Sequence, residues 1–298
     1  MKLFFLAVGS LIMLAATPGI TPAEELSGAL KKIKDTGIMV IGHRESSIPF
    51  SYYDDKNQVV GYSQDLAMIV ADAVKKKLSL PGLQVKLTPV TSQNRIPLVQ
   101  NGTVDLEAGS TTHNTERAKQ VAFSDTIFVV GTRLLVKKGS GIQDFPDLKG
   151  KNVVTTAGTT SERILRELNQ KGLGINLISA KDHGEAFLTL QSGRAAAFMM
   201  DDALLAGERA KARKPDDWVI VGTPQSKEAY AMAMRKDDPG FKQVADAAIA
   251  EAETSGVAAK LYQKWFQSPI PPKGLNLELP MNDDLKEVFA HPTDQAYQ

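Results

Sequence analysis

Two short stretches decide the fold, LVQNGTVDL at residues 98–106 and LQSGRAAA at residues 190–197. Both have the pattern of a helix end, a glycine suited to the left-handed conformation of a C-cap, and a strand. A unit that occurs twice in this order predicts two similar α/β arrays in one chain. With 298 residues, the chain is long enough for two compact units, each with its own core.

Strand and helix patterns alternate outward from both stretches. Apolar β-rich runs predict strands, and apolar residues spaced three and four apart predict helices. In the first array we expect strands at 38–41, 84–90 and 104–108 and helices at 64–78, 94–100 and 114–120. In the second we expect strands at 151–157, 176–180 and 195–200 and helices at 161–170, 184–191 and 203–212. This alternation predicts an α/β fold.

Two further extended segments, residues 126–138 and 229–236, separate the second array from the rest of the chain. We interpret them as a two-stranded hinge between two lobes. Lobe 1 would be discontinuous and consist of residues 24–130 and 231–298, whereas lobe 2 would span residues 131–230.

The part of lobe 1 that follows the hinge is expected to be mainly helical. Helices predicted at about 241–254 and 257–266 would pack back on the first array. The proline-rich segment PIPP (269–272) cannot continue a helix and would begin a wrapping tail.

The first 23 residues have the pattern of a secretory signal peptide. Lys2 supplies a positive start, an apolar stretch follows at 3–16, and TPA (21–23) is a small-residue cleavage site. The apolar run is shorter than the roughly 20 residues that span a bilayer, which disfavours a membrane anchor. The chain has no cysteine, so it can form neither a disulfide nor the acylated cysteine of a lipoprotein. We expect a soluble protein of the periplasm.

Charge and motif content argue against several classes of function. The chain has 35 Lys and Arg against 34 Asp and Glu, so we expect no nucleic-acid partner. It contains neither a Gly-x-Ser-x-Gly elbow nor a phosphate-binding or dinucleotide-binding glycine motif. Its four histidines lack the spacing of a zinc site: His43, His113, His183 and His291. We therefore expect no metal, no cofactor and no enzymatic activity.

Arginines and hydroxyl side chains follow several of the expected strands, at the sheet edge where open α/β folds bind ligands. They are Arg44, then Ser92 and Arg95 in TSQNR (91–95), then Ser110, Thr112 and Arg117, and finally Thr160 in GTTS (158–161). Helix capping explains Ser92 or the GTTS segment equally well when each is taken alone. Together they describe a pocket with three arginines and one or two aspartates, Asp201 and Asp202.

Several segments together resemble the glutamate/aspartate periplasmic binding proteins, a branch of the family 3 solute-binding proteins of ABC transporters. They are HRESS (43–47), TSQNR (91–95), STT (110–112) with Arg117, FSDT (123–126), SAKDHG (179–184), MMDDALLAGER (199–209), and KWF (264–266) with PIPP (269–272). The resemblance covers nearly all of the mature chain. It implies a two-lobed periplasmic binding protein type II fold, with a βα sheet sandwich in each lobe.

The resemblance also implies a role for each pocket residue. Arg117, Ser110 and Thr112, helped by Thr160, would hold the α-carboxylate of an amino acid, and Asp201 would bind its α-ammonium group. The side-chain carboxylate would be surrounded by Arg44, Ser92, Arg95 and His183, because cationic donors favour an acidic ligand over glutamine. Hinge closure would trap L-glutamate or L-aspartate in a monomer, which would deliver it to an inner-membrane ABC permease.

Three points stay open from the sequence. His183 stands in DHG (182–184) before a helix and could serve only as a cap. Asp202 competes with Asp201 for the ammonium role, although strand alternation directs only one of them to the cleft and the resemblance favours Asp201. Relatives often carry a cysteine pair where this chain has Ala108 and about Met232, so apolar contact would replace a disulfide.

Two other functions fit the same fold. One is a periplasmic dehydratase-like enzyme that uses a carboxylate as an acid, and the other is the ligand-sensing domain of a receptor or channel. The few acidic groups expected in the pocket serve as charge partners, which disfavours the enzyme. A sensing domain requires membrane segments, and the sequence after residue 23 predicts none.

Overall fold

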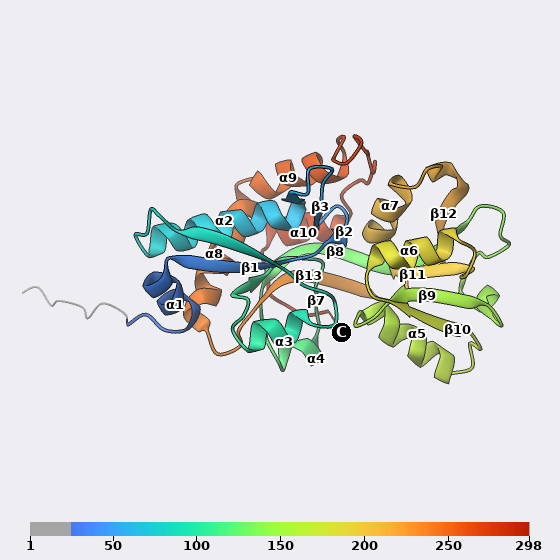
Figure 1. The fold of residues 1–298 in the computed structure, drawn as a ribbon, viewed down its shortest axis with the longest axis horizontal. Coiled ribbons are helices and arrows are strands. Elements are labelled where there is room, and N and C mark those ends of the chain that lie inside the picture. Colours follow the sequence, from blue (N-terminus) through green and yellow to red (C-terminus); the bar gives the residue numbers. More distant parts are fainter. Residues whose placement is uncertain (1–24, 298) are drawn as a thin grey trace, which may run out of the picture.

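The computed structural model describes residues 25–297, and the predicted signal peptide at 1–23 lies outside this part. The chain forms two lobes that lie end to end (Figure 1). One ten-stranded sheet runs through both, in the order β10-β9-β11-β8-β13-β6-β1-β5, with β12 paired to β8 and β7 paired to β13. The prediction of a two-lobed α/β fold is confirmed.

Lobe 1 is built on three parallel strands with helices on both faces. The middle strand is β1 (Ile38–His43), which pairs with β5 (Gln84–Pro89) and β6 (Leu106–Glu107). The helices α2 (Tyr62–Lys77) and α3 (Arg95–Gln100) cover opposite faces (Figure 1). Shorter elements complete this part: α1 (Gly28–Thr36), β2 (Ser46–Ser47), β3 (Ser51–Tyr53), β4 (Val59–Val60), β7 (Thr112–His113) and α4 (Thr115–Ala118).

Lobe 2 repeats this plan. Its middle strand β9 (Asn152–Thr156) is parallel to both β10 (Asn176–Ala180) and β11 (Ala197–Asp201). The helix α5 (Thr160–Gln170) lies on one face, and α6 (His183–Gln191) and α7 (Asp202–Ala210) lie on the other (Figure 1). Every residue of β11 is buried, which is typical of a strand covered on both faces. An edge strand, β12 (Trp218–Val221), pairs with β8.

The hinge consists of β8 (Ala122–Lys137) and the segment that enters β13 (Lys227–Met234). Residues 122–131 of β8 pair with β13 in lobe 1, and residues 132–136 pair with β11 in lobe 2. A hydrogen bond of 3.0 Å joins the hydroxyls of Thr132 and Ser226 where the two segments cross. The boundaries expected at 130/131 and 230/231 fall inside these two strands.

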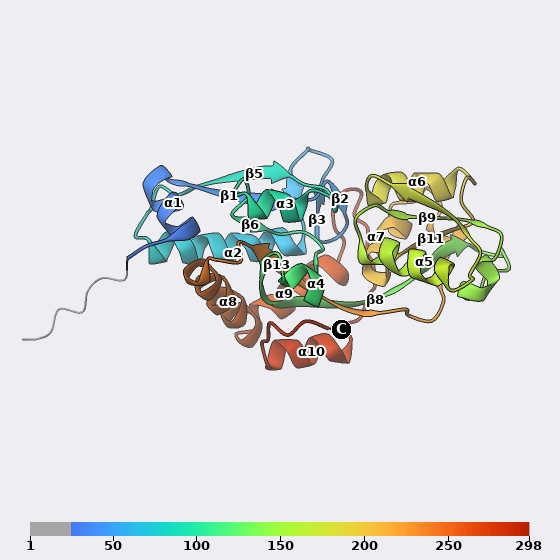
Figure 2. The same ribbon diagram turned by 90° about the horizontal axis from the view of Figure 1, so that it is seen from below.

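The chain after β13 returns to lobe 1. The helices α8 (Pro239–Thr254) and α9 (Val257–Phe266) pack there against α2. The tail then runs to α10 (Asp283–Ala290), which lies beside the hinge strand β8 (Figure 2). Asn282 donates a 3.1 Å hydrogen bond to the carbonyl of Val129 at that point.

The sequence patterns miss seven of these elements, the helices α1 and α10 and the short strands β2, β3, β4, β7 and β12, and they predict five residues for β6, which has two. The two missed helices have nine and eight residues. Helices this short have little stability of their own, so packing decides whether they form. The apolar face of α1, formed by Ala29, Leu30 and Ile33, is buried in the core of lobe 1.

Candidate functional site

The structure places the nine residues singled out by the sequence around the junction of the lobes. Lobe 1 contributes Arg44, Ser92, Arg95, Ser110, Thr112 and Arg117, and lobe 2 contributes Thr160, His183 and Asp201. Eight of the nine are at most 6% exposed, and Arg117 is partly exposed. Most follow the carboxyl end of a parallel strand, for example Arg44 after β1, Thr160 after β9 and His183 after β10. This edge is where open α/β sheets bind ligands.

The carboxyl group of Glu228, at the start of β13, connects the two lobes inside the site. It accepts hydrogen bonds from Thr112 of lobe 1 (2.5 Å) and from Thr160 of lobe 2 (2.7 Å). Ser226 donates to its other oxygen at 2.9 Å. Glu228 is 3% exposed, so these hydroxyls satisfy a carboxyl group that water hardly reaches.

Two of the three arginines of lobe 1, Arg95 and Arg117, are held by short hydrogen-bond networks. Arg95 Nη1 donates to the carbonyl of Ser110 (3.1 Å) and to Thr111 Oγ1 (2.5 Å), and Thr111 in turn donates to Glu107 Oε2 (2.5 Å). Arg117 Nη1 donates to the carbonyl of Thr112 at 2.9 Å. These bonds fix the direction in which each guanidinium points.

A second contact of Arg117 crosses between the lobes. Its Nη2 donates to the carbonyl of Gly158 in lobe 2 at 3.2 Å. Together with the bonds of Glu228 to Thr112 and Thr160, it shows that the lobes are in contact around the site. The described conformation is therefore closed.

Five of the nine residues carry a buried polar atom that has no hydrogen-bond partner within residues 25–297. These atoms are Arg44 Nη1, Ser92 Oγ, Arg95 Nε, His183 Nε2 and Asp201 Oδ1. A buried polar group without a partner costs about 1 to 3 kcal/mol, and more when the group is charged. Four of them offer donors and one offers an acceptor, so the arrangement fits a ligand that has both a negative and a positive group.

Burial and neighbouring charges shift the pKa values of the site's basic groups and leave His183 neutral and the arginines charged. Burial, followed by the nearby Arg44 and Arg95, lowers the pKa of His183 well below its usual value, so this imidazole is neutral. Burial and the Arg95 guanidinium lower the pKa of Arg44 to about 10 and that of Arg117 to about 9. Both guanidinium groups remain protonated at neutral pH.

Asp201 is a buried acidic side chain of the site that lies near Arg117. Burial, followed by the neighbouring Glu228, raises the pKa of Asp201, while a hydrogen bond donated by Tyr230 to its Oδ2 lowers that pKa. The cationic Arg117 lowers it as well. A second cation near the unpartnered Oδ1 would favour the ionised form of Asp201.

Capping does not account for Ser92 or His183. Asn94 is the N-cap of α3 and exchanges hydrogen bonds with Thr91 (2.7 and 3.2 Å), which leaves Ser92 out of the cap. Asp182 caps α6 by accepting from Glu185 N at 2.9 Å. His183 instead contacts Thr156 Oγ1 through Nδ1 at 2.8 Å, inside the site.

One threonine of the GTTS segment (158–161) caps a helix, and the other belongs to the site. Thr159 caps α5 by accepting from Glu162 N at 3.2 Å, and Thr160 donates to Glu228.

Asp202 begins α7 and is half-buried, and its carboxylate accepts a hydrogen bond from Ala203 N. Asp201, in contrast, is 4% exposed. Ala108 and Met232, between which we expected an apolar contact, are both fully buried.

Sequence reasoning missed several residues of the site, among them Glu107, Thr111, Thr156, Glu228 and Tyr230. Glu228 is bonded to Thr112, which lies 116 positions away in the chain. The only available signal was an acidic residue immediately before the hinge strand expected at 229–236. No spacing rule connects such distant positions.

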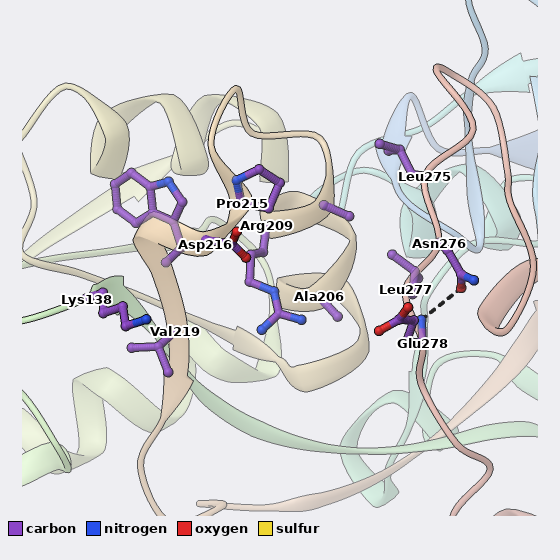
Figure 3. A pocket seen from close by; sticks show the side chains of 12 residues that line it. Lys138, Ala206, Arg209, Pro215, Asp216, Val219, Leu275, Asn276, Leu277 and Glu278 are labelled. Atoms are coloured by element: carbon purple, nitrogen blue, oxygen red, sulfur yellow. Dashed lines mark hydrogen bonds between the residues drawn. The ribbon is translucent and has the colours of Figure 1, made fainter.

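A separate cavity of about 520 Å³ lies outside this site, between lobe 2 and the C-terminal tail. Figure 3 shows Arg209 of α7 on one side and Asn276 and Glu278 of the tail on the other. It contains none of the nine residues, and its walls carry both cations and anions. Within residues 25–297, no group of His, Asp and Glu side chains could hold a metal ion.

None of the helices within residues 25–297 has the length and apolar character needed to cross a bilayer. Comparison with curated proteins finds several similar relatives, including the following two. The chain is 60% identical over 292 residues to the glutamate/aspartate import solute-binding protein of Salmonella typhimurium, covering 96% of this chain and 97% of the relative. It is 63% identical over 276 residues to the L-glutamate/L-aspartate-binding protein of Pseudomonas aeruginosa, covering 92% and 91%.

Among solved structures, an ancestral arginine-binding protein bound to arginine is similar, with 32% identity and a TM-score of 0.69. The match covers 77% of this chain and 98% of that one. The model of the bacterial extracellular solute-binding proteins, family 3, matches residues 39–268 and leaves the tail outside. The chain therefore belongs to the bacterial extracellular solute-binding proteins of family 3.

Proposed function

We propose that this protein binds L-glutamate or L-aspartate between its lobes and delivers it to an ABC permease of the inner membrane. The observation that carries the proposal is the set of five unpartnered polar atoms in a closed cleft that contains three arginines and one aspartate. An amino acid with a second carboxylate satisfies donors and acceptor at once. The names of the relatives at 60% and 63% identity agree with this ligand class.

The α-carboxylate subsite consists of Arg117, Ser110, Thr112 and Thr160. The hydroxyls of Thr112 and Thr160 already donate to Glu228, so their protons are engaged. The Thr160 N–H lies in the first turn of α5, where main-chain N–H groups lack an intrahelical acceptor. We therefore assign the carboxylate to the Arg117 guanidinium and to main-chain donors at this helix start.

Asp201 binds the α-ammonium group. Tyr230 holds Oδ2 and leaves Oδ1 as the acceptor that faces the site. An ammonium group placed there lowers the pKa of Asp201 and removes the cost of burying its charge.

The side-chain carboxylate is bound by Arg44, Ser92, Arg95 and His183. Each has a buried atom available, and three of the four are at most 2% exposed. Because His183 is neutral, the Thr156 hydroxyl can donate to Nδ1, which leaves the proton on Nε2 as a donor to the ligand. Glutamine offers these groups an amide without charge, so it should bind more weakly.

Ligand contacts from both lobes favour the closed state, which gives the permease a shape to recognise. We propose that the protein acts as a monomer in the periplasm. The dehydratase-like alternative finds no support in the relatives, whose names describe import or binding rather than catalysis.

Isothermal titration calorimetry with L-glutamate, L-aspartate and L-glutamine tests the proposal. We expect one or both acidic amino acids to bind roughly 100-fold or more tightly than glutamine, because the amide leaves buried guanidinium charge unpaired. Equal affinity for glutamine, or no heat with either acid, would reject it. An NMR time course of the same mixtures should show no new product.

A further inference from the structure

The two lobes also touch at a place that no ligand-binding residue occupies. The helix α7 of lobe 2 lies next to β2 of lobe 1 and the residues that follow it (Figure 1). Here Gly207 of α7 faces the main chain of Ile48, and both residues are buried.

Gly207 has no room for a side chain in the closed arrangement. A Cβ atom on Gly207 would lie 2.3 Å from the Ile48 carbonyl oxygen and 2.9 Å from its carbonyl carbon. Both atoms belong to the main chain of the other lobe, so a rotamer change cannot move them away. The overlap can be relieved only if α7 and the main chain of Ile48 move apart.

Glycine is not required here by the helix itself. Gly207 lies inside α7 (Asp202–Ala210), where glycine is one of the poorest helix formers and alanine the best. Gly240 in α8 provides a comparison, because a Cβ there would be 3.7 Å from Leu30 Cδ1, an ordinary contact. The close approach between the lobes therefore explains the glycine at 207.

Contact at Gly207 is coupled to the ligand site through α7. Asp201, the proposed partner of the α-ammonium group, is the N-cap of this helix. A displacement of α7 away from lobe 1 would carry Asp201 away from Tyr230 and Arg117, which lie across the junction.

We propose that Gly207 is a positioning residue that sets ligand affinity by allowing the lobes to close completely. The inference rests on the proposed function, because it treats binding and closure as one equilibrium. A side chain at 207 holds the lobes apart and leaves the open form unchanged, so it reduces the fraction of protein that can bind.

The test compares Gly207→Ala, Gly207→Ser and the control Gly240→Ala with wild type. Calorimetry with L-glutamate measures affinity, thermal unfolding without ligand measures stability, and small-angle X-ray scattering at saturating ligand measures the radius of gyration. For Gly207→Ala we expect roughly tenfold or more weaker binding and a larger liganded radius, with no loss of thermal stability. Gly207→Ser should bind L-glutamate no more tightly than Gly207→Ala. If helix propensity alone set the affinity, Gly207→Ser would instead lie between wild type and Gly207→Ala.

Three results would overturn the inference. Gly207→Ala could bind L-glutamate within about twofold of wild type, or it could lose affinity while its liganded radius equals that of wild type. It could also fail to fold while Gly240→Ala folds, which would place the overlap inside lobe 2. Failure of the proposed function is a different outcome, since wild type itself would then give no heat. In that case scattering still tests the closure role of Gly207. If wild type and Gly207→Ala have the same scattering profile with L-glutamate, that role is rejected as well.

Discussion

Glu253 gives a stability prediction whose size follows from its environment. This residue lies on α8, is 4% exposed, and has no hydrogen-bond partner for either carboxyl oxygen within residues 25–297. Burial, followed by the nearby Asp125, raises the pKa of Glu253 from 4.5 to about 9. The folded protein therefore holds the neutral acid, whereas the unfolded chain ionises it.

The sign of the effect follows from this difference in pKa. Below pH 4.5 the Glu253 carboxyl group is neutral in both the folded and the unfolded states. Between pH 4.5 and about 9, the free energy of unfolding falls by about 1.4 kcal/mol for each pH unit. At about pH 7 the accumulated loss is about 3 kcal/mol. Glu253→Gln keeps the shape, cannot ionise, and should be more stable than wild type by about this amount at neutral pH.

Urea unfolding followed by tryptophan fluorescence measures this free energy near pH 5 and near pH 8. The free energy of unfolding of Glu253→Gln should exceed that of wild type by a small amount at the lower pH and by several kcal/mol at the higher one. The difference should grow by about 1.4 kcal/mol per pH unit. Glu251→Gln, on the same helix but exposed, is the matched control and should show no such trend. A pH-independent difference between Glu253→Gln and wild type would refute the reasoning.

The remaining predictions concern the ligand site. Asp201→Asn should weaken L-glutamate binding by about 2 to 5 kcal/mol, because it leaves the ammonium group unpaired, and a loss below about threefold in calorimetry would contradict its role. Arg95→Ala should reduce the preference for glutamate over glutamine, whereas the exposed Arg213→Ala should preserve it; unchanged selectivity would remove Arg95 from the side-chain subsite. Because burial raises the pKa of Asp201 and the ligand ammonium group lowers it, binding should release protons and strengthen as pH rises through the free-state pKa of Asp201. Calorimetry in buffers of different ionisation heat measures this release, and equal heats would count against it.

Ligand binding should also relieve a repulsion built into the cleft. Arg95 lowers the pKa of both Arg44 and Arg117, which means that its positive charge disfavours the protonated form of each. An anionic ligand between them reverses this effect and stabilises the closed protein.

Most of the fold was accessible from local patterns. Strand β10 begins and ends at the predicted residues, and α5 and α9 differ from their predictions by at most one residue. The edge position of Arg44, Ser92, Arg95 and Asp201 followed from strand ends, because parallel strands place these ends at one edge. Helices α1 and α10 could not be predicted, since their short lengths give a weak periodic signal and packing stabilises them.

By itself, the sequence determined the alternation of strands and helices, the absence of cysteine, and the polar residues that follow the strands. These features are local or compositional, so neighbouring residues suffice to read them. Only the tertiary structure decided that Glu228 joins Thr112 to Thr160 and that Gly207 faces the Ile48 carbonyl. Both contacts connect residues far apart in the chain, and their distances depend on how the lobes meet, which no local pattern encodes.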